Sequence, residues 1–519
     1  MNGEPAGSTP AAGTAERSAA PANRAAITAS IMLATFMQGV DTTITNVALP
    51  HMQGSLSASQ DQIAWVVTSY IVAAAIMTPL TGWLAGRFGI KYVFLISVAG
   101  FTVASALCGL AASLLQLVIY RLLQGVCGAA LVPLSQAVLF QINPPERHAK
   151  AMAVWGMGVI LGPIIGPALG GWLTDYYNWR WVFYINLPVG VLASLGILIF
   201  IRETRHGHRE AFDFFGFAAL SLAIGALQML LDRGELKDWF GSPEIWVEAT
   251  IAGLALYLFI VHTATTGERS FLNRELLHDS NCMVGTLLMF LIGIPLYGTM
   301  TLLPLMLQNL MNYPVVTTGL VTAPRGIGTM VAMFVVARLV GRVDIRLIIL
   351  TGLLVTVTSL WQMTGFSLQM GMSPIIVSGV LQGFGLGFVF TPLSVITFST
   401  LPRHIMTQGT AIFSLMRNIG GSIGISIVVA LLAENTQTVH SRLIENLRPD
   451  NPLAHHLAAP YSLSTATGIA ALNAEATRQA AMVAYLDDFK LMMMIVLAAA
   501  PLLLLLRRPQ PRAVPAAAE

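Results

Sequence analysis

The feature that most constrains this chain is a series of apolar runs, each about as long as a helix that crosses a lipid bilayer, roughly 20 residues. Only 10% of the 519 residues are charged, against about 25% in soluble globular proteins, so the chain lacks the charges to cover these runs with a polar surface. Most of the protein is therefore expected to lie in lipid. We count fourteen expected spans: 27–49, 63–85, 92–113, 117–140, 150–172, 181–201, 214–231, 245–263, 283–306, 316–338, 347–366, 374–398, 408–432 and 485–506.

The positions of the positive residues test this count, because lysine and arginine in short loops collect on the cytoplasmic side of a membrane. With fourteen spans, most of the 28 Lys and Arg residues fall in loops on one side. This pattern predicts that both termini are cytoplasmic. The net charge of +3 provides no basic surface for nucleic acid, so a nucleic-acid-binding protein is excluded.

Short internal matches predict two related halves. Residues 86–91, after the second run, resemble residues 341–346 after the tenth, and Leu-Gln-Gly at 123–125 in the fourth run recurs at 381–383 in the twelfth. Each match joins a run to the one eight runs later, as expected for two six-span halves separated by two extra spans. Parallel halves with a substrate site between them are typical of secondary transporters that work by alternating access.

The fold class expected is an all-α membrane protein of two six-helix bundles plus two extra helices. The domains expected are a disordered cytoplasmic tail at 1–24, an N-terminal bundle at 25–203, two inserted spans at 204–265, a C-terminal bundle at 266–508 that includes a polar outer loop at 434–484, and a second cytoplasmic tail at 509–519.

Asp41 is the one acidic residue that we find deep inside an apolar run. An ionised carboxylate in lipid costs several kcal/mol, so an acid in a membrane span is by default a hypothesis of function. Gln38, Asp41 and Thr45 share one face of the expected first helix. Burial favours the protonated carboxyl, which makes reversible proton binding reasonable at this site. The alternative is a structural acid paired with a neighbouring helix.

Three arginines also lie inside expected spans: Arg121, Arg325 and Arg417. An arginine is permanently charged, so each must face protein or water rather than lipid. Arg121 and Gln124 lie one turn apart on the fourth run, where the arginine either tunes proton release from a carboxylate or ties helices together. The candidates for the substrate cavity are Gln38, Thr45, Gln124, Arg325 and Arg417. The alternative for Arg325 and Arg417, in the second half, is that they are structural anchors.

A ridge without side chains is expected along the fifth span, because glycines recur there every four residues. Such a ridge lets another helix backbone approach closely, and prolines beside it bend the helix. Packing explains the pattern, and so does a hinge or a seal against leak. The residues are Gly158, Gly162, Pro163, Gly166, Pro167, Gly170 and Gly171.

Signals of an enzyme are weak. The sequence has no Gly-x4-Gly-Lys-Ser/Thr loop, no His-Glu-x-x-His and no Cys-x-x-Cys, so neither ATP-driven transport nor a familiar metal site is indicated. The three cysteines lie in or beside apolar runs and are interpreted as packing residues. No metal ligand and no cofactor are predicted.

With these motifs in place, the chain resembles the major facilitator superfamily, and within it the fourteen-span drug:proton antiporters of the EmrB/QacA type. The residues 82–91 resemble the superfamily's gating loop motif through Gly82, Arg87, Gly89 and Lys91, although Gly86 and Ile90 stand where many members carry Asp and Arg. The first-span stretch around Asp41, the fourth-span stretch around Arg121, the fifth-span glycines and residues 178–188 also resemble stretches of this group.

The resemblance implies a bacterial inner-membrane exporter of amphipathic cationic or neutral drugs, driven by the proton gradient rather than by a cofactor. Asp41 and Arg121 would couple the proton, and the fifth-span motif marks exporters. It also implies a partnership with a periplasmic membrane fusion adaptor and an outer-membrane channel, for which the outer loop at 434–484 is a candidate docking surface.

Three alternatives stay open. The first is an exporter of one metabolite, such as a siderophore, on the same fold. The second is a membrane sensor or scaffold that transports nothing and does not need Asp41. The third is a membrane-embedded enzyme, which is disfavoured because one buried acid without metal ligands supplies little catalytic apparatus.

Overall fold

The computed structural model describes residues 23–203, 212–266, 270–402, 404–445, 461, 463 and 465–507. Within these residues the chain is helical and forms no β-strand beyond one isolated bridge between Val340 and Val343. Apart from Asn23 and Arg24, the two expected tails at 1–24 and 509–519 lie outside the described residues.

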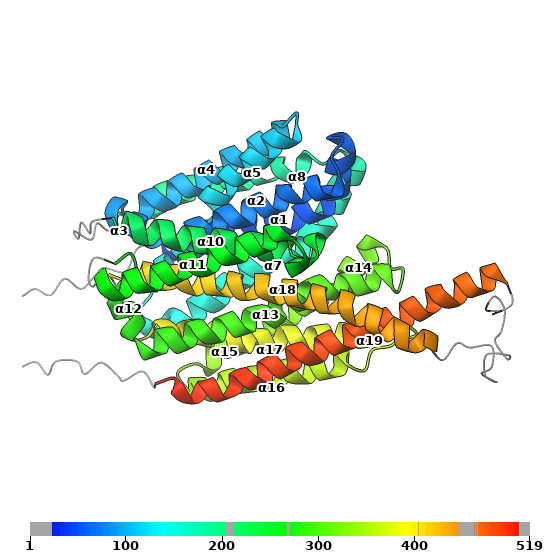
Figure 1. Cartoon of the computed structure of the whole chain (residues 1–519). Helices are drawn as coiled ribbons and strands as arrows, with labels where there is room; N and C mark the ends of the chain where they lie inside the picture. Colours follow the sequence, from blue (N-terminus) through cyan, green and yellow to red (C-terminus); the bar gives the residue numbers. More distant parts are fainter. Residues whose placement is uncertain are drawn as a thin grey trace, which may run out of the picture.

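The helices up to residue 200 pack mainly on one another and form an N-terminal group (Figure 1). The helix His148–Tyr176 lies along the helix Arg24–Ser55, which also contacts the helix Asn186–Phe200. The helices Gln60–Met77 and Ile90–Leu110 both contact the helix Leu114–Gly128. The group consists of α1 (Arg24–Ser55), α2 (Gln60–Met77), α3 (Leu80–Phe88), α4 (Ile90–Leu110), α5 (Leu114–Gly128), α6 (Leu131–Ile142), η1 (Pro145–Arg147), α7 (His148–Tyr176), α8 (Trp181–Tyr184) and α9 (Asn186–Phe200).

The helices from residue 274 onward form a C-terminal group with the same pattern of neighbours. In it, α18 lies along α13, and α15 and α16 both contact α17. The group consists of α12 (Arg274–His278), α13 (Ser280–Asn309), α14 (Val315–Thr322), α15 (Pro324–Leu339), α16 (Ile345–Met363), α17 (Met372–Phe398), α18 (Met406–Glu445), α19 (Ala466–Ala499) and η6 (Ala500–Leu505).

Two further helices, α10 (Phe214–Arg233) and α11 (Pro243–Thr266), joined through η2 (Glu235–Lys237) and η3 (Trp239–Gly241), stand between the groups in sequence and lie across both in space (Figure 1). On the N-terminal side α10 packs on α2. On the C-terminal side the Gln228 amide donates to Ser422 Oγ at 2.9 Å, and Ser426 Oγ donates to the Leu231 carbonyl at 2.7 Å. Helix α10 therefore contacts both helix groups.

Twelve helices of the described chain are long and apolar enough to cross a membrane, or thirteen if the bent pair α2 and α3 counts as one span. Every expected run coincides with a helix or a broken helix. The first run lies in α1, which has the length but is not among the apolar helices, because it carries the polar stripe around Asp41. The structure thus supports a multi-pass membrane protein and gives twelve or thirteen spans by composition where the sequence predicts fourteen.

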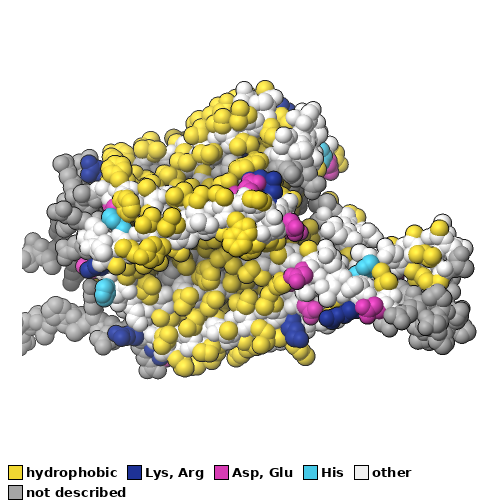
Figure 2. Space-filling view, in the orientation of Figure 1, with side chains coloured by type: hydrophobic (Ala, Val, Ile, Leu, Met, Phe, Trp, Pro, Cys, Tyr) yellow, Lys and Arg dark blue, Asp and Glu magenta, His cyan; other side chains and the backbone are white. Residues whose placement is uncertain are grey.

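The surface has the character of a membrane protein. Large apolar side chains are exposed on many of the helices, with Ile96 at 68%, Leu254 at 57% and Trp361 at 64% exposure. Figure 2 shows hydrophobic side chains over the middle of one face, while charged side chains gather toward its two ends. A belt of this kind is stable in lipid and not in water.

Proline and glycine set the break in the second span. Pro79 separates α2 from α3, and the two helices meet at a bend of 56°. Helix α3 then ends at Gly89, whose φ of +93° suits a residue without a side chain. The bend places residues 80–88 against α18, because a Cβ at Gly82 would lie 2.9 Å from the Gln408 Cα.

The two helix groups meet through α7, which contacts α14, α15 and α17, and also at the end of the molecule that carries α3. There the Phe140 and Phe398 rings lie 5.4 Å apart, and the Trp155 and Phe390 rings stack at 6.0 Å. These contacts close the interface between the groups at this end.

The expectation of a loop at 434–484 is wrong for the residues described. Helix α18 continues to Glu445, and α19 begins at Ala466, so both helices extend past the other ends of the bundle (Figure 1). The cause is composition: residues 466–484 are rich in alanine and other strong helix formers, which carry a helix beyond its apolar part.

Candidate functional site

The site is built around Asp41, which lies in the middle of α1 and is completely buried. Arg121 of α5 donates from Nη1 to Asp41 Oδ2 at 2.7 Å. The Arg121 side chain is 1% exposed, so both charges of this ion pair are removed from solvent. Breaking such a pair by removing one partner typically costs about 3–5 kcal/mol, because the other charge stays buried.

Two amides complete the surroundings of the carboxylate. Gln124 Nε2 and Asn186 Nδ2 each donate to Asp41 Oδ1 at 2.8 Å, and Arg121 Nη1 also donates to Gln124 Oε1 at 2.8 Å. The carboxylate therefore accepts hydrogen bonds from α5 and α9 while it belongs to α1. These donors stabilise its ionised form, and protonation would weaken the bonds that hold the three helices together.

Arg121 links the site to α2 as well. Its Nε donates to the Val66 carbonyl at 3.1 Å, and its guanidinium carbon lies 4.5 Å from the centre of the Tyr70 ring. A second ring, that of Phe183, lies 5.7 Å away. The cation is thus satisfied by a carboxylate, an amide, a carbonyl and two aromatic faces.

Asn186 is a residue of this site that sequence reasoning missed, although it lies in the stretch 178–188 that resembles the family. Its amide bridges Asp41 and Ser105 Oγ, which it reaches at 2.9 Å, and Ser105 in turn donates to the Phe183 carbonyl. An uncharged amide at the start of an apolar run was the available signal. It is weaker than a charge, because an amide at a span boundary is common.

The other residues of the expected polar stripe point elsewhere. Thr45 is buried and donates to the Asp41 backbone carbonyl at 2.8 Å, so its hydroxyl serves the helix rather than the carboxylate. Gln38 lies within 3.5 Å of the Tyr70 hydroxyl, one turn from Asp41. Gln38 therefore borders the site without touching the ion pair.

The glycine ridge of α7 packs directly on α1 beside Asp41. A Cβ at Gly162 would lie 2.7 Å from the Gly39 carbonyl carbon, one at Gly158 2.8 Å from Met32 Cε, and one at Gly170 2.7 Å from Ile44 Cγ1. Gly166 faces Thr43 in the same way. Pro163 and Pro167 lie inside this helix. Gly171 faces open space and is not part of the contact.

The residues of the loop motif lie away from the carboxylate, at the end where the two groups meet. Arg87 lies over the Trp83 ring at 5.6 Å, and Lys91 Nζ donates to the Leu198 carbonyl at 2.8 Å. Gly82 is the member that faces the opposite group, through Gln408. The structure thus separates this motif from the Asp41 carboxylate.

The two arginines of the C-terminal group are not brought to Asp41. Arg325 Nη2 donates to the Leu296 carbonyl at 3.3 Å, and Arg417 lies 3.4 Å from its neighbour Asn418. Among the described side chains neither forms an ion pair. Both remain candidates for the substrate cavity.

Asp488 corrects the expectation that Asp41 is the one deeply buried acid. It lies on α19, is 0% exposed, and has no hydrogen-bond donor on either carboxylate oxygen among the described residues. Sequence reasoning missed it because Asp487 and Lys490 beside it are polar and place it at the boundary of the last run. Asp487 is exposed, so the helix turns one acid outward and the other inward.

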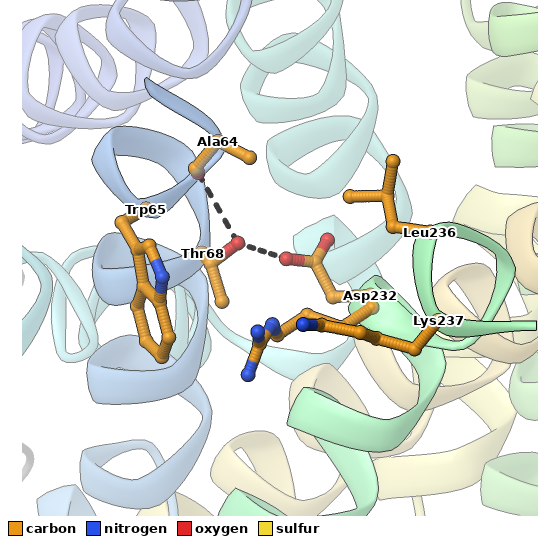
Figure 3. Close-up of a pocket in the computed structure, with 7 residues that line it drawn as sticks. Ala64, Trp65, Thr68, Asp232, Leu236 and Lys237 are labelled. Carbon is orange, nitrogen blue, oxygen red and sulfur yellow. Dashed lines mark hydrogen bonds between the residues drawn. The ribbon is translucent and has the colours of Figure 1, made fainter. Parts of the chain in front are cut away.

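A small pocket lies apart from this site, between α2 and the inserted helices. Figure 3 shows Thr68 and Asp232 pointing toward one another, with Trp65, Leu236 and Lys237 around them. The Thr68 hydroxyl is bonded to the Asp232 carboxylate. This hydrogen bond joins α10 to α2 of the N-terminal group. No group of three or more His, Cys, Asp or Glu side chains suited to a metal ion occurs in the described part of the chain.

Comparison with known proteins agrees with this geometry. Residues 31–425 match the family model described as Major Facilitator Superfamily. The chain is 36% identical to the multidrug export protein EmrB of Haemophilus influenzae over 90% of this chain and 92% of that one, and 37% identical to EmrB of Escherichia coli K12 over 82% and 84%. It is 35% identical to the fatty acid resistance protein FarB of Neisseria gonorrhoeae over 88% and 91%.

A solved structure shares the fold. The human organic anion transporter MFSD10 superposes with a TM-score of 0.57 at 14% identity, covering 91% of this chain and 99% of that one. At this identity the likeness concerns the helical architecture.

Proposed function

The chain belongs to the Major Facilitator Superfamily and is a transporter rather than an enzyme, and from this premise we propose that it exports drugs in exchange for protons. The names of its EmrB relatives support export of chemically varied compounds. The observation that carries the proposal is the buried carboxylate of Asp41, held by Arg121, Gln124 and Asn186.

The proton step follows from these contacts. When Asp41 is ionised, it accepts bonds from α5 and α9 and holds them against α1. When it takes a proton, Arg121 loses its counter-charge, and the three helices are free to shift. A substrate that binds the state favoured by the ionised carboxylate promotes proton release, and by reciprocity the proton weakens the binding of that substrate.

The helices around the site supply the conformational change. The close approach of α7 to α1 along Gly158, Gly162, Gly166 and Gly170 forms a seal that keeps protons and ions from leaking past the carboxylate. At the end of the molecule that carries α3, Gly82 of the N-terminal group packs against Gln408 of the C-terminal group and holds the two groups together. The loop motif with Arg87, Gly89 and Lys91 opens this contact when the transporter changes state.

The proposed topology has fourteen spans, with α1 as the span that composition alone does not single out. The N-terminal and C-terminal groups then supply six spans each, and α10 and α11 supply two. The excess of positive residues in loops on one side supports cytoplasmic termini in a bacterial inner membrane.

A periplasmic adaptor with an outer-membrane channel is the partner that the resemblance to the EmrB type implies. The projecting parts of α18 and α19 are the proposed docking surface, because they extend beyond the rest of the bundle on the side assigned to the periplasm (Figure 1). Deletion of residues 446–464 together with these helical extensions should abolish resistance in cells and leave drug-driven proton movement in vesicles intact.

Proton release from acidified inside-out membrane vesicles tests the function. Addition of ethidium and of other unrelated drugs should trigger release in the unmodified protein and none in Asp41→Asn at matched expression. If only one compound in a broad panel triggers release, the protein is an exporter of narrow specificity. If Asp41→Asn releases protons as the unmodified protein does, the assignment of Asp41 is wrong.

A further inference from the structure

The contact between the two helix groups at the end that carries α3 is built from aromatic rings of both groups. Phe140 of α6 packs on Phe398 of α17 with ring centres 5.4 Å apart. Trp155 of α7 stacks on Phe390 of α17 with ring centres 6.0 Å apart and an interplanar angle of 13°. We call these four rings the aromatic closure. Ring contacts of this kind hold the groups together without hydrogen bonds between them.

Gln136 of α6 lies in this interface with an amide that has no partner. It is one turn before Phe140, which faces the C-terminal group. On its other side it is next to Ser135, whose Oγ accepts a hydrogen bond from Trp155 Nε1 at 2.8 Å. Gln136 is 0% exposed, and neither its Nε2 nor its Oε1 has a hydrogen-bond partner among the described residues.

Helix α17 brings a second unpaired polar group to the same interface. Thr391 follows Phe390 and lies on the same face of α17 as Phe398, two turns away. It is 0% exposed, and its Oγ1 has no hydrogen-bond partner within the described part of the chain. Thr397 of the same helix, by contrast, donates to the Leu393 carbonyl at 2.6 Å. Each helix group thus places an unpaired polar side chain beside the aromatic closure.

These two side chains destabilise the closed contact. A buried polar group without a partner has given up its hydrogen bonds to water and has gained none from the protein. When the groups part at this end, as the proposed function requires, water reaches Gln136 and Thr391 and restores those bonds. The aromatic closure therefore favours the closed state, and the two polar side chains favour the open one.

A third unpaired polar side chain lies inside one helix group and so has no such effect. Gln382 of α17 is 0% exposed, and its amide has no partner among the residues described. It lies on the arc of α17 between Gly385, which packs on α16, and Thr397, which packs on α13. Helices α13, α16 and α17 all belong to the C-terminal group. Gln382 therefore stays between the same helices when the two groups move apart.

We propose that Gln136 and Thr391 set the equilibrium between the closed and open states of the end that carries α3, and that their unpaired polar atoms favour opening. Both are positioning residues, because they act through the contact between the groups rather than on the proton. The inference rests on the proposed function and adds to it the residues that keep opening accessible against the aromatic closure.

Double electron–electron resonance on the purified protein in nanodiscs measures this equilibrium. One spin label replaces Glu146 of η1, which follows α6, and the other replaces Thr400, which follows α17. Both positions are exposed and belong to opposite groups. The background carries alanine in place of the free cysteines Cys108, Cys127 and Cys282 and must retain ethidium-triggered proton release. The ratio of long to short label distances reports the ratio of open to closed protein.

Replacing the amide of Gln136 with an apolar group should close this end. Gln136→Leu should lower the ratio of open to closed protein by at least about tenfold, because the closed state no longer contains the unpaired amide. Thr391→Val, which removes one hydroxyl at nearly constant shape, should lower it about fivefold. Gln136→Asn keeps an amide and should leave the ratio close to that of the unmodified protein.

Gln382→Leu is the matched control, because it makes the same replacement at an equally buried unpaired amide within one helix group. It should leave the ratio unchanged. An equal decrease in Gln382→Leu and Gln136→Leu would overturn the inference, since the effect would then not depend on the interface between the groups.

Other results would also contradict the inference. An unchanged ratio in Gln136→Leu would do so, and so would a higher ratio, which would mean that the amide holds the closed state together. A single closed distance in the unmodified protein would show that the two residues do not make opening accessible. If ethidium triggers proton release while the ratio fails to respond to either variant, the proposed function stands and this inference alone is removed. If the ratios shift as expected but no drug triggers release, the proposed function fails and this inference stands.

Discussion

The N-terminal and C-terminal helix groups repeat one packing scheme and fill it with different charges. In both, a glycine after a buried glutamine admits a carbonyl of the neighbouring helix, Tyr70 at Gly125 and Arg325 at Gly383. In the first group Arg121 and Asp41 neutralise each other, and in the second Arg325 forms no ion pair among the described side chains. A position that touches a neighbouring backbone must remain glycine because it has no room for a side chain. The charged positions beside these glycines have no such restriction and can differ between the two groups. We interpret the difference as a division of labour, in which the N-terminal group carries the proton-coupling site that we propose.

Removing the paired arginine should have the largest effect. Arg121→Gln leaves Asp41 buried without its cation, so we expect a loss of about 3–5 kcal/mol of stability and no drug-triggered proton release. Arg325→Gln breaks no ion pair, so its stability should be unchanged or higher. Thermal unfolding of both purified variants measures the contrast, and equal destabilisation would show that Arg325 has a partner comparable to Asp41.

Removing one amide from the carboxylate should have the next largest effect. Asn186→Ala deletes a hydrogen bond to a charged group, worth about 1.5–3 kcal/mol, and should weaken coupling without abolishing it. Ser105→Ala removes only the second partner of that amide and should cost less. The ratio of protons released to drug moved is the readout, and a normal ratio in Asn186→Ala would exclude Asn186 from the proton site.

Substitution of closely packed glycines tests whether the N-terminal and C-terminal groups depend equally on close contacts between their helices. Gly162→Ala places a Cβ 2.7 Å from the Gly39 carbonyl carbon, and Gly424→Ala places one 2.7 Å from Ile294 Cα. Each should cost about 1–3 kcal/mol, the usual range for overpacking. Gly171→Ala, which meets nothing within 4 Å, is the control. A transport defect in the first variant and none in the second would mean that the seal lies on the α7 side alone.

The smallest effect is expected at the unpaired acid. Asp488→Leu removes a buried carboxyl that has no donor among the described residues, so stability should stay within about 1 kcal/mol of the unmodified protein or rise. Asp41→Leu should be strongly destabilising by contrast. Asp487→Asn, at the exposed neighbour, controls for the change of surface charge. A large loss of stability in Asp488→Leu would reveal a partner for that carboxyl.

The sequence predicts the positions of the long helices well because each apolar run must satisfy its backbone as a helix in lipid. It also points to Asp41, Arg121 and Gln124, because a charge inside an apolar run is rare and costly. That these three meet is a matter of packing, which periodicity on one helix cannot show.

The residues that sequence reasoning missed have weaker local signals. Asn186 reaches Asp41 from 145 positions away in the sequence, and nothing in its own neighbourhood indicates that contact. Asp488 looks like part of a polar stretch, since only the turn of α19 separates it from the exposed Asp487. Arg325 forms no ion pair among the described side chains, and this becomes visible only once its neighbouring helices are packed.

The most direct test of the division of labour compares two fluxes of ethidium in proteoliposomes that contain the unmodified protein or Asp41→Asn. One flux is accumulation driven by an imposed proton gradient, and the other is exchange of labelled for unlabelled ethidium at equal pH. We predict that Asp41→Asn loses the first and keeps the second, because its neutral amide resembles the protonated carboxyl while the substrate path is intact. Gradient-driven accumulation by Asp41→Asn at the level of the unmodified protein would contradict the assignment of the proton to Asp41.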